Sequence, residues 1–87
     1  MKSIFEVVRY DDVRDKDTDR RLFNKREDAD KFARYLLEES MINRTNLEYS
    51  KDPSGNYHVT YIVDENIDDP WDDNSYCSII ITERRVF

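Results

Sequence analysis

Residues 24–40, NKREDADKFARYLLEES, carry the clearest helical period in the chain. Their apolar side chains recur at helical spacing and form one stripe on an α-helix, which consists of Ala29, Phe32, Ala33, Leu36 and Leu37. Charged residues of both signs fill the rest of the helix surface. Asn24 and Glu27 have the spacing of a capping box, which predicts that Asn24 caps the helix. A helix with one apolar stripe has to bury that stripe against another element.

The segments around this helix are rich in β-branched and aromatic residues, which is typical of strands. We expect strands at residues 3–10, 20–23, 45–51, 57–64 and 76–87, with residues 11–19 forming a polar acidic loop. Gly55, the sole glycine, follows Asp52-Pro53-Ser54 and predicts a hairpin turn between two of these strands. The chain is therefore predicted to be one α+β domain over residues 1–87. In it a single helix packs on one face of a mainly antiparallel sheet of four to five strands, in the order strand-strand-helix-strand-strand-strand.

The second face of this sheet is expected to stay partly bare, because one helix covers only one face. Several strands carry apolar or aromatic residues on both faces. In residues 57–64, the set Tyr57, Val59, Tyr61 and Val63 lies opposite the set containing His58 and Ile62, and either set can face the helix. An uncovered apolar face favours a partner or a second copy of the chain. The alternative is that tyrosines and the stems of Arg and Lys side chains lie over it.

The apolar content and net charge of the sequence indicate whether the chain can fold and which kinds of partner it can bind. Leu, Ile, Val and Phe make up 21 of 87 residues, which lies just above the level of roughly 20% where disorder becomes the default. The formal net charge is −6, of which residues 11–19 carry −3 and residues 64–73 carry −6. Such a chain is repelled by nucleic acids and anionic membranes and favours cationic protein surfaces. One cysteine, no signal-peptide pattern and no long apolar run indicate a cytoplasmic protein.

Catalytic and metal-binding patterns are weak. His58 and Cys77 are the sole histidine and cysteine, so a Cys–His pair needs adjacent strands with both side chains on one face. Glycine-rich phosphate loops are missing from the sequence, and its carboxylate pairs lie in polar loops where water screens them. Residues 15–19 resemble the opening of an EF-hand loop, but Arg20 and Arg26 occupy the positions of the required Gly and Glu. We therefore expect no enzyme, no metal and no cofactor.

The acidic segment 64–73 is the strongest candidate for a partner-binding site. Pro70-Trp71 lies between two pairs of aspartates, so Trp71 can act as an aromatic anchor surrounded by carboxylates. Alternatively, Trp71 packs against the edge of the core and the carboxylates only solvate the loop. The predicted partner-binding residues are Asp64, Glu65, Asp68, Asp69, Trp71, Asp72 and Asp73, together with Tyr57 and Tyr61 on the sheet.

These observations favour a non-catalytic protein-binding module whose acidic surface engages a basic protein, with no direct nucleic-acid or membrane binding. A concrete form is a phage-type inhibitor of the anti-CRISPR or anti-restriction kind, acting in the host cytoplasm. Such an inhibitor blocks a nucleic-acid-binding site by charge mimicry, and this form rests on analogy of size and charge. The main alternative is a homodimeric accessory protein that pairs through the open sheet face. A further alternative is a single-stranded nucleic-acid binder that stacks bases on sheet tyrosines.

Overall fold

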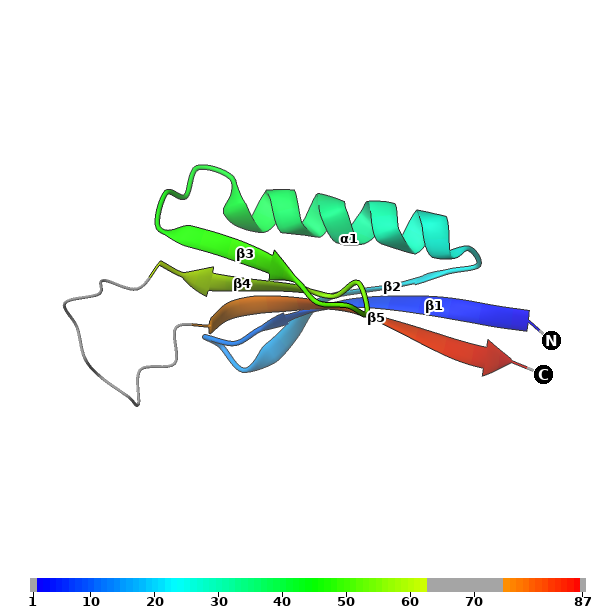
Figure 1. The fold of residues 1–87 in the computed structure, drawn as a ribbon. Coiled ribbons are helices and arrows are strands. Elements are labelled where there is room, and N and C mark those ends of the chain that lie inside the picture. The colour runs from blue at the N-terminus through cyan, green and yellow to red at the C-terminus, as the bar shows by residue number, and fades with distance from the viewer. Residues whose placement is uncertain (1, 63–74, 87) are drawn as a thin grey trace.

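The computed structural model describes residues 2–62 and 75–86 and has an α+β fold. One helix lies against an open antiparallel sheet of five strands (Figure 1). The elements in chain order are β1 (Lys2–Asp11), β2 (Lys16–Phe23), α1 (Arg26–Met41), β3 (Leu47–Lys51), β4 (Tyr57–Tyr61) and β5 (Ser75–Val86). The predicted fold class and element order are confirmed.

The strands lie in the order β2-β1-β5-β4-β3, so β5 occupies the centre of the sheet. Val7 of β1 lies opposite Ile81 of β5, and Val59 of β4 lies opposite Cys77 of β5. Helix α1 covers the face that these side chains share (Figure 1). Because side chains alternate between the two faces of a strand, this register fixes which residues lie under the helix.

The hydrophobic core lies between α1 and the covered face of the sheet. The apolar stripe of the helix is confirmed, with Phe32 half-buried at its margin. The buried apolar residues are Val7, Ala29, Ala33, Leu36, Leu37, Leu47, Tyr57, Val59, Cys77, Ile79 and Ile81. None of the helices among the described residues is long and apolar enough to cross a membrane.

The helix begins one residue later than a cap at Asn24 predicts, and the predicted Asn24 cap is wrong. Lys25 occupies the N-cap position in an extended conformation, and no side chain caps the first turn. The Lys25 carbonyl accepts the first helical hydrogen bond from the Ala29 amide at 3.2 Å. Asn24 therefore lies one residue outside the position from which a side chain reaches the first-turn amides.

The hairpin between β1 and β2 is tighter than predicted, because β2 begins at Lys16 rather than at residue 20. The Asp11 side chain accepts hydrogen bonds from the amides of Val13 at 2.9 Å and Arg14 at 3.0 Å. Asp15 takes a left-handed conformation with φ 56°. The chain therefore reverses within four residues, and residues 16–19 of the expected loop belong to β2 despite their low strand propensity.

The predicted turn at residues 52–55 is confirmed. The Gly55 amide donates to the Asp52 carbonyl at 3.0 Å, and Gly55 has φ 91°. The positive φ favours glycine at this position, whereas the Arg26 guanidinium that a Cβ atom would approach to 2.7 Å is the end of a flexible side chain and can move. Asn56 immediately precedes β4, and its side chain accepts a hydrogen bond from the Ile81 amide of β5 at 2.8 Å.

Candidate functional site

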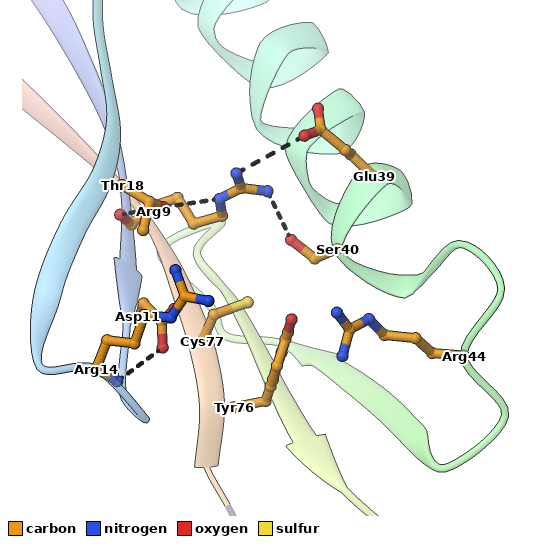
Figure 2. Close-up of a pocket in the computed structure, with 9 residues that line it drawn as sticks. All are labelled: Arg9, Asp11, Arg14, Thr18, Glu39, Ser40, Arg44, Tyr76 and Cys77. Carbon is orange, nitrogen blue, oxygen red and sulfur yellow. Dashed lines mark hydrogen bonds and ion pairs between the residues drawn. The ribbon is translucent and has the colours of Figure 1, made fainter.

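A polar pocket of about 340 Å³ opens at one end of the interface between α1 and the sheet. It lies where the helix ends, where the β1–β2 hairpin turns and where β5 begins (Figure 2). We call this site the end pocket. Its lining residues are Arg9, Asp11, Arg14, Thr18, Glu39, Ser40, Arg44, Tyr76 and Cys77.

Two β-bulges shape the end pocket. Between β1 and β2 the pairing passes from Arg9↔Asp19 to Tyr10↔Asp17, which leaves Thr18 as the extra residue. Between β4 and β5 it passes from Val59↔Cys77 to Thr60↔Ser75, which leaves Tyr76 as the extra residue. A bulge interrupts the alternation of side chains and re-aims one of them. Thr18 and Tyr76 both line the pocket, Tyr76 together with its neighbour Cys77.

Arg9 is the most enclosed charge of the pocket, with 17% of its side chain exposed. Its Nε donates to Thr18 Oγ1 at 3.0 Å, and its Nη1 donates to Ser40 Oγ at 3.0 Å. Its Nη2 forms ion pairs with Asp19 and, at 3.8 Å, with Glu39 (Figure 2). Ser40 in turn donates to the Leu36 carbonyl at 2.8 Å. Arg9 of β1 therefore links the last turn of the helix to the edge strand β2.

The other two arginines of the pocket are held more loosely. Arg14 is 71% exposed, and its Nε lies 3.9 Å from Asp11 Oδ2. The Arg44 guanidinium lies over the Tyr76 ring, 4.8 Å from the ring centroid. Figure 2 shows both groups pointing toward the space above Cys77, with the Tyr76 hydroxyl beside them.

Cys77 and His58 do not form a Cys–His pair. They lie on adjacent strands, but Cys77 shares the covered face with Val59, whereas His58 lies opposite Ser78 on the other face. Burial raises the pKa of the Cys77 thiol, against the opposing effect of a hydrogen bond with Ser40, so the thiol is protonated at neutral pH. His58 Nε2 lies 3.0 Å from Asp52 Oδ2 in the turn before β4.

The predicted partner-binding residues fall into two groups: two tyrosines that the structure describes and seven residues that lie outside the described ranges. Tyr57 lies in the core at 6% exposure, and Tyr61 lies half-buried on the same covered face, with its ring edge-on to Tyr76. Neither ring lies on the open face, because the Tyr57/Val59 set is the one that faces the helix. The other members of the predicted set lie outside the described residues: Asp64, Glu65, Asp68, Asp69, Trp71, Asp72 and Asp73.

The open face carries a short apolar row that no described element covers. Val8 and Ile80 are cross-strand partners there and are half-buried by their neighbours on the sheet. Leu22 on the edge strand is 58% exposed. Beside this row, Glu6 is buried and accepts a hydrogen bond from Arg84 at 3.1 Å, so an arginine side chain already covers part of the face.

Sequence reasoning did not find the end pocket, although two of its residues left a signal. Arg9 follows Phe5 and Val7 in the alternation that places side chains under the helix. Ser40 falls four residues after Leu36, at a buried position of the helical stripe. A charged or polar residue at an otherwise apolar buried position indicates a polar site.

The fold and the pocket define a one-helix α+β protein on an open antiparallel sheet, with an arginine-lined cavity at one end. Within residues 2–62 and 75–86, no three His, Cys, Asp or Glu side chains are grouped so that they could hold a metal ion. No protein-family model, curated protein or solved structure matches the chain.

Proposed function

We propose that the protein is a non-catalytic protein-binding module whose acidic end engages a basic protein surface. One observation supports the proposal: the β1–β2 turn, the end of β4 and the start of β5 lie at the same end of the sheet. β1 ends at Asp11, opposite Cys77 of β5, and β4 ends beside Ser75. Residues 11–19 begin at that end, and residues 64–73 are joined to it on both sides.

The negative charge of residues 11–19 and 64–73 is large for a chain of 87 residues. The two segments carry −3 and −6, whereas the rest of the chain carries +3. An asymmetric charge of this size steers a basic partner toward one end and suppresses binding to anionic surfaces. A specific form of this function is the occupation of a nucleic-acid-binding site in the cytoplasm, as phage inhibitors of the anti-CRISPR or anti-restriction kind do.

The test is capture of partners from a lysate with the immobilised protein, followed by elution with salt or with double-stranded DNA. We expect basic nucleic-acid-binding proteins to be retained and to be released by DNA, because a charge mimic and DNA compete for one site. A variant that neutralises four carboxylates of the acidic segment is expected to lose this capture without a change in the free energy of unfolding. The variant is Asp68→Asn, Asp69→Asn, Asp72→Asn and Asp73→Asn.

A matched control removes the same charge from exposed positions elsewhere: Glu27→Gln, Asp28→Asn, Glu38→Gln and Glu48→Gln. It is expected to retain the same partners as the unmodified protein. Equal loss in both variants would show that net charge alone is responsible. Unchanged capture by the first variant would contradict the proposal.

The second candidate function is self-association through the open face, and it is favoured by the uncovered row of Val8, Ile80 and Leu22. Burial of apolar residues depends little on salt, so light scattering is expected to give twice the monomer mass at any ionic strength. Leu22→Glu would then give a monomer. A monomeric unmodified protein at high concentration would exclude this function.

A further inference from the structure

The end pocket has a size and a chemistry that the binding of a protein partner does not require. Its volume of about 340 Å³ lies at the low end of the range for small-molecule sites, roughly 300–1,000 Å³. Its lining is mostly polar and includes three guanidinium groups. A cavity of this kind suits a small anionic molecule rather than an apolar one.

Arg9 is built into the walls of the pocket and is not the group that would hold a ligand. Its hydrogen bonds go to Thr18 and Ser40, and its charge is matched by Asp19 and Glu39. Its role is to fix the position of the helix end against the β1–β2 bulge. The site is therefore built before any ligand arrives, which lowers the entropic cost of binding.

Arg14 and Arg44 differ from Arg9 because their guanidinium groups make few contacts with the described residues. Among the described residues, neither guanidinium donates a hydrogen bond to an acceptor, and the sole ion pair of Arg14 is the long contact with Asp11. The Arg44 guanidinium carbon lies 4.8 Å from the centroid of the Tyr76 ring, and this contact uses no hydrogen-bond acceptor that an anion would have to displace. These planar groups carry donors in a fork that matches the oxygens of a phosphate or carboxylate.

We propose that the end pocket binds a small molecule through a phosphate or carboxylate group, held between Arg14 and Arg44 with the Tyr76 hydroxyl beside it. Asp11 of the first acidic segment also lines the pocket, with its Oδ2 3.9 Å from Arg14 Nε, so an anion competes with this carboxylate for Arg14. Arg44 forms no ion pair among the described residues, and a direct contact between its guanidinium and an anion is only weakly screened by salt. The proposal does not depend on the proposed protein-binding function.

The experiment is an NMR titration of the full chain with inorganic phosphate and, separately, with succinate, each at constant ionic strength set with chloride. We expect saturable shifts of the amides of Ser40, Cys77 and Thr18. Saturation by phosphate alone identifies a tetrahedral ligand group, and saturation by succinate alone identifies a carboxylate. Saturation by neither anion would overturn the proposal.

Substitutions of the two arginines test whether the anion binds in the end pocket. Arg44→Gln and Arg14→Gln are each expected to weaken binding about tenfold or more, the effect of losing charge-assisted hydrogen bonds. Arg44→Lys keeps the charge but not the fork, and an intermediate affinity is expected. The matched control is Arg34→Gln, at an exposed helix position outside the pocket, which should bind like the unmodified protein. Equal weakening by Arg34→Gln and Arg44→Gln would show a general charge effect and overturn the site.

Discussion

Helix α1 makes two different kinds of contact with the sheet along its length. Through most of its turns, Ala33 and Leu36 share an apolar core with Val7 and Ile79, all of them nearly inaccessible to solvent. At its last turn the same stripe presents Ser40, which bonds to a charged side chain of β1. We refer to these as the apolar section and the polar end. The difference shows what one polar residue in the stripe changes. The apolar section closes the core, whereas the turn that carries Ser40 borders a cavity.

The largest effect is expected in the apolar section. Leu36→Ala removes a side chain that is 1% exposed, and we expect the free energy of unfolding to fall by about 2–5 kcal/mol because a cavity is left. Chemical denaturation measures this change. The exposed Lys31→Ala serves as the control and should cost less than about 0.5 kcal/mol. Equal effects for the two variants would show that the apolar section does not dominate stability.

A smaller loss is expected at the polar end from Arg9→Met. This change leaves Asp19 and Glu39 without their cation and Ser40 without its donor. We expect a cost of about 1–3 kcal/mol, since a partly buried carboxylate without a partner is desolvated but not fully enclosed. A double-mutant cycle with Asp19→Asn measures the coupling. A coupling energy near zero would mean that the ion pair does not hold the polar end together.

Ser40→Ala should have a still smaller effect, about 1 kcal/mol or less. The change removes the acceptor for Arg9 and the donor to the Leu36 carbonyl, while the better helix propensity of alanine offsets part of the loss. The free energies of unfolding of Ser40→Ala, of Arg9→Met and of the double variant show whether the two substitutions remove the same interaction. Fully additive losses would argue against a joint network.

The smallest expected effect lies far from both sections, in the β3–β4 turn. Hydrogen bonds from His58 and from the Asn56 amide lower the pKa of Asp52 from 3.8 to about 2. A lowered folded-state pKa contributes stability above pH 3.8, and this contribution is lost as the pH falls through about 2. Asp52→Asn should remove this component from a pH series of denaturation curves while leaving the amide resonances of the end pocket unchanged. An unaltered acid profile would contradict the assignment.

Most of the fold could be predicted from the sequence because hydrophobic periodicity reports which side chains share a face. The stripe through Ala29, Ala33 and Leu36 gave the helix, and Gly55 gave the turn. The start of β2 could not be read in this way. Its acidic residues have low strand propensity, and pairing with β1 overrides that preference.

The end pocket could be predicted only in part. Arg9 and Ser40 break an apolar pattern, and that signal is present in the sequence. Thr18 and Tyr76 reach the pocket through bulges, which depend on how β2 pairs with β1 and how β5 pairs with β4. The residue pattern of a single strand does not encode a register shift against its partner strand.

The central position of β5 has a consequence for how the chain folds. β5 follows every other element in the chain, yet it joins the β1–β2 hairpin to the β3–β4 hairpin. During synthesis the two hairpins therefore emerge without the strand that links them, and a two-stranded hairpin is at best marginally stable in water. Pairing β1 with β5 closes a loop of nearly the whole chain, so folding is expected to be slow and to begin only after translation of β5.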